Sequence, residues 1–290
     1  MSNQITTAFV QQYSSNVQML SQQMGSLLRS AADVETIVGK NAFFDQVGKT
    51  TAQVRTSRHA DTPQIDTPHS RRRVTLADYE WADLIDNQDK VRMLIDPTSA
   101  YAKAAAAAMG RAMDDVIITA LGGTSFTGET GATSVVLPAA QKPFSASQTD
   151  GLTIPKLLEA KKILDLADVD PSIQRYFVCG PKQISDLLGT TQVTSSDFNT
   201  VKALAQGQVD SFMGFKFIVS NRLSFDATNT DDRLTYAFTA DAIKLAVGKD
   251  VMARIDERAD KSYSTQVYYC MSIGATRMEE EKVVQIACDE

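Results

Sequence analysis

The residues with the greatest chemical potential lie in one short stretch, Arg58–Arg73. Both histidines of the chain, His59 and His69, occur here, with Asp61 and Asp66 between them. Imidazole and carboxylate groups are common metal ligands, and a histidine beside an acid can move protons. The stretch therefore admits three interpretations: a metal site, an acid–base pair, or a charged loop whose histidines take no part in chemistry.

The loop interpretation agrees best with the surroundings of the two histidines. Pro63 and Pro68 bias the residues before them to extended conformations, so the segment stays open rather than helical. A catalytic base needs a rigid and partly desolvated seat, which such a segment does not offer. The chain also has no GxSxG, GxxxxGK(S/T), HExxH or CxxC motif. We therefore expect no catalytic, cofactor-binding or metal-ligating residue; a metal-dependent enzyme that uses His59 and His69 is the alternative.

Charged residues in this stretch and directly beside it in the sequence indicate a contact between chains. Five arginines make it basic, and five acids follow it: Arg55, Arg58, Arg71, Arg72 and Arg73, then Asp78, Glu80, Asp83, Asp86 and Asp89. Blocks of opposite charge so close in sequence cannot all pair within one chain, but they suit a basic loop tip on a neighbour's acidic base. We predict an intersubunit interface made of the five arginines and the first four acids. A solvated charged loop is the alternative, and a nucleic-acid patch lacks interleaved aromatic residues.

Length and composition describe an ordinary folded chain. Its 290 residues suffice for two domains, or for one domain with long excursions. The content of 43% hydrophobic and 22% charged residues is typical of folded proteins, and a net charge of −6 argues against a general nucleic-acid binder. An odd number of cysteines without CxxC spacing predicts reduced thiols at Cys179, Cys270 and Cys288.

Neither a membrane span nor a signal peptide is expected. No apolar run reaches the roughly 20 residues that cross a bilayer. The first residues, MSNQITTAFVQQYSSN, lack the basic and apolar regions of a signal peptide. We expect a chain that is made in the cytoplasm and stays out of membranes.

The elements that position the charged stretch begin with a polar arm. Residues 1–35 carry few apolar side chains, and their spacing suits a thin amphipathic helix around residues 15–30 that docks on something else. A frayed terminus is the alternative. Strand-like pieces then flank the charged stretch and predict a long two-stranded excursion: Phe43–Val47, Thr51–Arg55 and Arg73–Leu76. A lone pair of strands is barely stable in water, so the excursion must lie against something.

The clearest helix runs from about residue 98 to Leu121. The alanine run Ala104–Ala108 favours helix, and Gly122 and Gly123 end it. A helix of this length spans roughly 35 Å, and its face of small residues lets other backbones approach closely. We expect a scaffold axis with its charged residues off the packed face: Lys103, Arg111, Asp114 and Asp115.

The rest of the chain reads as a compact α/β region followed by strands. Residues 123–151 are expected to form a loop or hairpin. Three helices and two strands follow: helices Ile154–Asp168, Pro181–Leu188 and Phe198–Ala205, and strands Arg175–Cys179 and Phe215–Ser220. The last fifty residues are mostly extended, with one alanine-rich turn: strands Leu234–Thr239, Val251–Glu257, Ser262–Thr276 and Lys282–Ala287, and the turn Ala240–Val247.

In this order the features resemble the major capsid protein of tailed double-stranded DNA bacteriophages, with the Hong Kong 97-type fold in its podovirus-like form. Four stretches carry the resemblance: VTLADYEWADLIDNQDK after the loop, DPTSAYAKAAAAAMGRAMDDVIITALGG in the long helix, QGQVDSFMGFKFIVSN and TADAIKLAVGKDVMARIDER. The resemblance covers nearly the whole chain. It implies an α+β fold and a structural role rather than an enzymatic one.

The resemblance also implies a domain organisation. It predicts an N-terminal arm (residues 1–40) and an extended loop with its base (41–92). It also predicts a peripheral domain (93–150 with 238–290) that contains a spine helix (98–121), and an axial domain (151–237). Hexamers and pentamers of such subunits tile an icosahedral shell. The shell would enclose double-stranded DNA without binding it sequence-specifically.

Partners and location follow from the same resemblance. We expect a separate scaffolding protein, a portal and room for decoration proteins, and a chain made in the bacterial host's cytoplasm and found in the virion head. Lys49 lies near the start of the loop but no lysine lies at its tip, so no covalent crosslinking is expected. An encapsulin-like nanocompartment shell, which shares the fold and encloses protein cargo, is the closest alternative. A nucleic-acid-binding module is a third.

Overall fold

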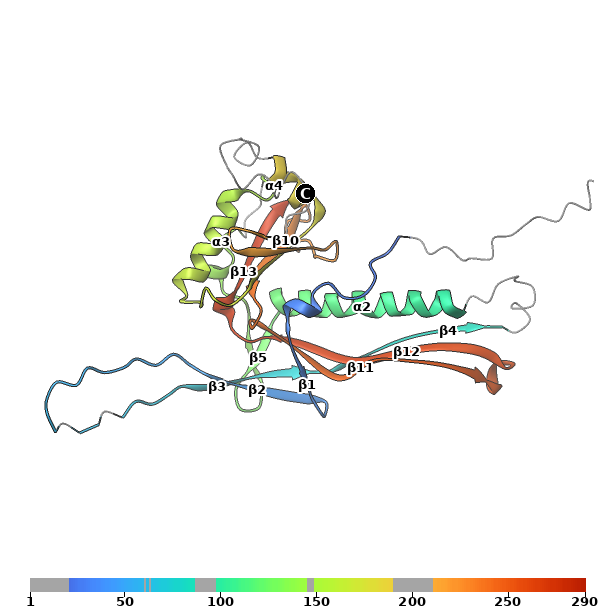
Figure 1. Cartoon of the computed structure of the whole chain (residues 1–290), viewed down its shortest axis with the longest axis horizontal. Helices are drawn as coiled ribbons and strands as arrows, with labels where there is room; N and C mark the ends of the chain where they lie inside the picture. Colours follow the sequence, from blue (N-terminus) through green and yellow to red (C-terminus); the bar gives the residue numbers. More distant parts are fainter. Residues whose placement is uncertain (1–20, 60, 63, 87–97, 145–148, 190–210) are drawn as a thin grey trace, which may run out of the picture.

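A long helix lying along a long twisted sheet forms the axis of the molecule. The computed structural model describes residues 21–59, 61–62, 64–86, 98–144, 149–189 and 211–290, and Figure 1 shows their arrangement. Helix α2 (Thr98–Gly122) contains the alanine run and ends at the predicted glycines, where the Gly123 amide donates to the Thr119 carbonyl. The predicted spine helix is confirmed to within one residue.

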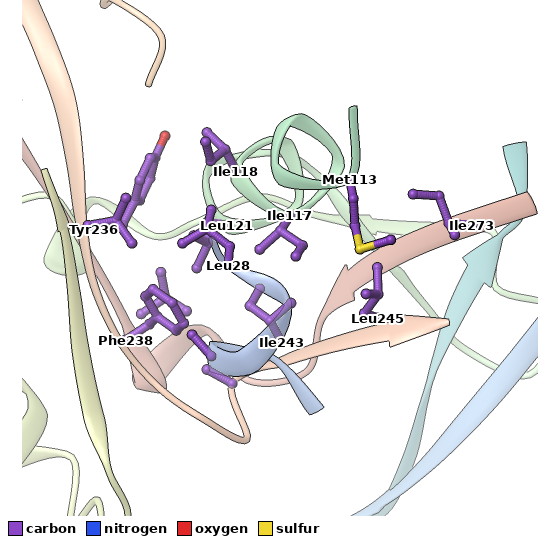
Figure 2. Close-up of a cluster of buried hydrophobic side chains, with 14 of the residues drawn as sticks. Leu28, Met113, Ile117, Ile118, Leu121, Tyr236, Phe238, Ile243, Leu245 and Ile273 are labelled. Atoms are coloured by element: carbon purple, nitrogen blue, oxygen red, sulfur yellow. The ribbon is translucent and has the colours of Figure 1, made fainter. Parts of the chain in front are cut away.

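The sheet beneath α2 is built from a long antiparallel hairpin. Four strands form it in the order β1-β11-β12-β4: β1 (Asp33–Thr36), β4 (Ala77–Ile85), β11 (Ile243–Arg258) and β12 (Ser264–Arg277). Met113, Ile117 and Leu121 of α2 pack on the strands beneath, as Figure 2 shows. Burial of this apolar surface holds the helix on the sheet.

A compact second lobe stands above one end of α2 (Figure 1). Its five strands follow the order β13-β10-β7-β9-β8: β7 (Arg175–Cys179), β8 (Ser211–Phe212), β9 (Phe215–Val219), β10 (Asp232–Thr239) and β13 (Val283–Asp289). Helices α3 (Ile154–Leu166) and α4 (Pro181–Gly189) accompany them. Leu157 and Leu164 of α3 share a buried cluster with Phe177 of the sheet.

A third sheet carries the root of the charged loop. Its order is β2-β3-β5-β6: β2 (Asn41–Val47), β3 (His69–Thr75), β5 (Ser125–Thr127) and β6 (Thr133–Val135). The hairpin β5–β6 confirms the loop or hairpin predicted after the long helix. Four short 3-10 turns complete the described chain: η2 (Arg29–Ala31), η3 (Ala139–Gln141), η4 (Ala259–Lys261) and η5 (Glu280–Lys282).

Some predicted elements differ from the structure. Thr51–Arg55 is not a strand, and the described residues 21–28 are not helical. The predicted turn Ala240–Val247 is wrong beyond residue 242, because β11 begins at Ile243. Leu245 and its neighbour Ala246 point into different cores, so both faces of this strand are buried and the sequence shows no alternation. The predicted helix Phe198–Ala205 lies outside the described residues.

Candidate interaction surfaces

The charged loop extends away from the body of the molecule (Figure 1). At its root the Gly48 amide donates to the Pro68 carbonyl, with 2.8 Å between nitrogen and oxygen. Beyond that bond, every described residue up to Ser70 is exposed and none belongs to a strand before His69. Val54, in the middle of the first arm, is 88% exposed. Backbone groups and apolar side chains displayed in this way are available to a neighbouring chain.

The loop arginines and histidines lie on this open segment or at its edge. Arg55 and Arg58 are exposed, and the Arg55 Nε donates locally to the Ser57 carbonyl at 2.9 Å. His59 is exposed in a left-handed turn (φ 60°), and His69 is the exposed first residue of β3. Within the described ranges, no three His, Cys, Asp or Glu side chains gather closely enough to hold a metal ion.

The three consecutive arginines of β3 point to two different faces. Side chains alternate along a strand, so Arg72 points inward while Arg71 and Arg73 point outward. Arg72 is only 7% exposed: its Nε donates to the Met278 carbonyl at 2.9 Å, and its Nη2 to Glu280 at 2.6 Å. The prediction that Arg72 belongs to an intersubunit surface is therefore wrong, because the chain's own carboxylate already neutralises it in the interior.

Arg71 and Arg73 lie over aromatic rings on the outward face of the same sheet. The guanidinium carbon of Arg73 is 4.9 Å from the ring centre of Phe126, and that of Arg71 is 5.6 Å from Phe43. Arg71 also pairs with the exposed Asp45 at 3.1 Å. The rings are 40% exposed at Phe43 and 38% at Phe126, so the stacks remain open to a partner. We call Phe43, Arg71, Arg73 and Phe126 the arginine face.

A shallow groove of about 640 Å³ adjoins the arginine face at the root of the loop. It lies between β3 and the turn of the β5–β6 hairpin, and its lining includes both charge signs: Asp45, His69, Ser70, Arg71, Thr127, Gly128 and Glu129. Mixed charge of this kind suits a protein surface better than a phosphate backbone.

The acids after the loop are also divided between two faces, because side chains alternate along β4. On β4, Tyr79 and Trp81 turn toward α2 and pack on the main core. Asp78 and Glu80 lie on the opposite, exposed face of the sheet. Asp83 is exposed, but it lies on the same face of β4 as Trp81. Asp86 is half-buried just past the end of the strand, and Asp89 lies outside the described residues.

A tyrosine on the neighbouring strand holds one of these exposed acids in place. The Tyr268 hydroxyl donates to Glu80 Oε1 at 2.9 Å. This hydrogen bond to the carboxylate is the main reason why the pKa of Tyr268 is raised to about 12. We call Asp78, Glu80 and Tyr268 the acid face.

A buried junction, which was not predicted from the sequence, fixes the loop root to the rest of the molecule. Arg277 at the end of β12 is fully buried, and its Nη1 donates to the Leu121 and Gly123 carbonyls, both at 2.8 Å. It thus binds the carbonyl end of α2, where a positive charge is favourable. Burial is the main cause that lowers the pKa of Arg277. Glu280 lies between its Nε (3.6 Å) and Arg72 (2.6 Å).

The junction therefore joins β3, the end of α2 and the crossing from β12 into the second lobe. The one sequence signal was an arginine at the end of an apolar strand, followed three residues later by a glutamate. That pattern is too common to single out a buried ion pair.

The three cysteines are free and buried. Burial raises the pKa of Cys179 to about 12 and that of Cys288 to about 11, which suppresses the reactive thiolate in both. The described part of the chain also contains no helix that is long and apolar enough to span a bilayer.

Comparison with known proteins gives a family and a set of similar folds. The family model described as phage capsid protein matches residues 5–290. No curated protein sequence matches the chain. Among solved structures, the capsid of cyanophage P-SCSP1u is similar with a TM-score of 0.74 and 17% identity, over 97% of this chain and 93% of that one.

Two further structures show the same likeness. The capsid of Ralstonia phage GP4 has a TM-score of 0.74 and 13% identity, over 97% of this chain and 95% of that one. The chain from Mycobacterium phage Che8 has a TM-score of 0.70 and 16% identity, over 96% of both chains. At these identities the likeness speaks for the fold, and it confirms the predicted α+β architecture.

Proposed function

The chain belongs to the phage capsid protein family, and we propose that it is the major subunit of an icosahedral phage head. Its role is structural, and its fold is the Hong Kong 97-type expected from the sequence. In this proposal its copies assemble as hexamers and pentamers around double-stranded DNA, which they enclose without sequence-specific contacts. We further propose that it has no catalytic activity and is made in the cytoplasm of a bacterial host.

The match of the family model to residues 5–290 carries the proposal, and the exposed loop supports it independently. An open segment of about 20 residues has no core of its own, and few contacts stabilise its conformation while it is exposed to water. It gains order when it lies on another copy, where its backbone and its apolar side chains find partners. The loop thus supports self-assembly rather than a role as a monomer.

The interface that we propose brings the arginine face of one copy onto the acid face of the next. Arg71 and Arg73 are two residues apart on one strand, and Asp78 and Glu80 are two residues apart on another. Both rows therefore have the same spacing of roughly 6.5–7 Å. Opposite charges at matched spacing favour this register and disfavour others.

This pairing joins two different patches, so it is heterologous. A heterologous contact repeats from copy to copy and closes into a ring when the rotation allows. Arg55 and Arg58 extend the basic surface along the loop in this proposal. Asp83 and Asp86 remain predicted contributors at its acidic end, whereas Arg72 is left out.

Domains and partners complete the proposal. We propose the division expected from the sequence: an arm (residues 1–40), a loop with its base (41–92), a peripheral domain (93–150 with 238–290) and an axial domain (151–237). The sheet order favours one change to these bounds, because β13 pairs with β10 in the second lobe and therefore belongs with the axial domain. A separate scaffolding protein, a portal and decoration proteins are proposed partners. The family match favours a phage head over an encapsulin-like compartment.

Negative-stain microscopy and sedimentation of the expressed chain test the proposed function. We expect rings, tubes or closed shells of uniform subunit spacing, and capsomers of five and six copies at lower concentration. A chain that sediments only as a monomer at every concentration, alone and in lysate of infected cells, would contradict it.

A further inference from the structure

The carboxylate of Asp114, in the middle of α2, is fully buried. The prediction that this residue lies off the packed face is wrong, because a segment far away in the sequence covers it. Gln23 Nε2 and Ser26 Oγ each donate to the carboxylate at 2.5 Å, and the backbone amides of Leu27 and Leu28 donate at 3.1 Å. All these donors are neutral groups of residues 23–28. A buried carboxylate is stable there only because so many donors surround it.

One turn earlier, α2 makes room for the same segment. A Cβ at Gly110 would lie 2.3 Å from the carbonyl carbon of Gly25, so the two backbones touch where neither residue has a side chain. Gly25 itself has a φ of 79°, which favours glycine. Next to it, Arg111 Nη1 donates to Gln22 Oε1 at 3.0 Å and to the Gln23 carbonyl at 3.2 Å.

The segment continues from this seat into the main core. Leu28 is fully buried among α2 and the strands beneath it (Figure 2). Arg29 pairs with Asp250 at 2.8 Å, and β1 then adds a parallel strand to β11. Residues 22–36 therefore form a strap across α2, and we use that name below.

The part of the strap before Leu28 is held on α2 by hydrogen bonds and by the close approach of Gly25 to Gly110. Residues 22–28 have no helix or strand of their own, and Met24 and Leu27 point partly into solvent. Without Asp114, the amides of Leu27 and Leu28 and the Ser26 hydroxyl would lose their acceptor. One side chain thus fixes the path of residues 23–28 along α2.

We propose that Asp114 is a positioning residue for assembly: it anchors the N-terminal arm on the spine helix, and Gly110 supplies the space for that anchor. Equivalent subunits of a closed lattice must send their arms along equivalent paths. An arm released from α2 samples many directions, so its contacts with neighbouring copies lose their register. This inference uses contacts within one chain and does not depend on the charged interface proposed above.

Hydrogen exchange of the unassembled subunit tests the anchor. In Asp114→Asn, which keeps the size of the side chain, the amides of Leu27 and Leu28 should exchange about 10- to 100-fold faster, because a charged acceptor is lost. Asp115→Asn is the matched control: Asp115 is the next residue and is half-exposed, and it pairs with Arg222 rather than with the strap. It should leave both amides unchanged.

Gly110→Ala separates loss of the strap from damage to the helix. Alanine is a better helix former than glycine, so α2 itself gains stability. The new Cβ nevertheless meets the backbone of Gly25, so the strap must move. We expect faster exchange at Leu27 and Leu28 and faster tryptic cleavage after Arg29, with unchanged helical circular dichroism.

Assembly provides the functional readout. Both Asp114→Asn and Gly110→Ala should give fewer and less uniform particles than the wild type, and Asp115→Asn should not. Unchanged exchange in Asp114→Asn would overturn the anchor, and uniform particles from a variant with fast exchange would overturn its role in assembly. If the wild type itself forms no particles, the proposed function fails, while exchange still tests the anchor.

Discussion

The projecting loop and the buried junction use the same residue types for opposite purposes. At the junction, Arg72 and Arg277 are buried around Glu280, and each finds its partners within the chain. On the loop, Arg55 and Arg58 remain exposed, and on the adjoining outward face Arg73 is half-exposed over Phe126. The difference shows that arginine content alone says nothing about interfaces. The side of the strand on which an arginine lies decides whether it stabilises the fold or remains available to a partner.

The largest effect should come from removing the acid at the junction. Glu280→Ala leaves two buried guanidinium groups without the carboxylate that balances their charge. The loss should lower the free energy of unfolding by about 3–5 kcal/mol. Urea denaturation of the unassembled subunit measures it. Glu281→Ala is the control, because that side chain is 58% exposed and its pair with Lys49 lies at the surface. It should change stability by roughly 0.5 kcal/mol or less; equal losses in the two variants would contradict the junction.

Charge reversal on the outward face should affect assembly far more than folding. Arg73→Glu loses a cation–π contact of about 0.5–1 kcal/mol in stability. It should nevertheless reduce particle yield at least tenfold, because like charges would meet across the interface. Adding Glu80→Arg in the same chain restores opposite charges and should recover particles. Sedimentation measures the yield, and a double variant no better than Arg73→Glu alone would remove Glu80 from the interface.

A carboxylate outside the junction, that of Asp241, should give the fold a dependence on acid. Burial works against the charged form of Asp241, but hydrogen bonds from Lys282 and Thr239 outweigh it and hold its pKa below the ordinary value of 3.8. A carboxylate with a lowered pKa stabilises the fold fully above the unfolded pKa and loses that stabilisation as the pH falls through the folded pKa.

The wild type should therefore lose more stability than Asp241→Asn between pH 6 and pH 3. Because Asp241 is only half-buried, we expect a difference of about 1 kcal/mol or less. Urea denaturation at several pH values measures it, and parallel pH profiles of the two proteins would show that this carboxylate carries none of the acid sensitivity.

The smallest effect is expected for the two histidines. The double variant His59→Ala with His69→Ala removes two exposed side chains and should change stability by roughly 0.5 kcal/mol or less. Particle yield should be unchanged as well. Elemental analysis of wild-type and variant particles is the second measurement. A bound metal that disappears in the double variant would restore the metal-site interpretation.

The sequence predicted the elements with strong local signals. The alanine run and the following glycines gave the bounds of α2, and the short apolar run of β7 was also correct. The open loop followed from Pro63 and Pro68. Each of these features depends on neighbours within a few residues, which is the range over which local propensity acts.

Contacts between distant segments could not be predicted. β3 begins at His69 rather than at Arg73, so its alternation, which separates Arg72 from its neighbours, lay outside the predicted strand. Asp114 looked like a surface acid because the strap that buries it comes from residues about ninety positions earlier. The buried ion pair between Arg72 and Glu280 likewise joins residues 208 positions apart.

Cross-linking between copies tests most directly that the arginine face of one subunit lies on the acid face of the next. Cysteines placed by Arg73→Cys and Glu80→Cys can be joined by a short bismaleimide in a chain that also carries Cys270→Ser, because Cys270 lies directly opposite Glu80 on the next strand. The other two native cysteines, Cys179 and Cys288, are fully buried. A heterologous contact predicts a ladder of covalent products up to six chains, and neither single variant should give it. Products that stop at dimers, or no products from assembled particles, would contradict the account.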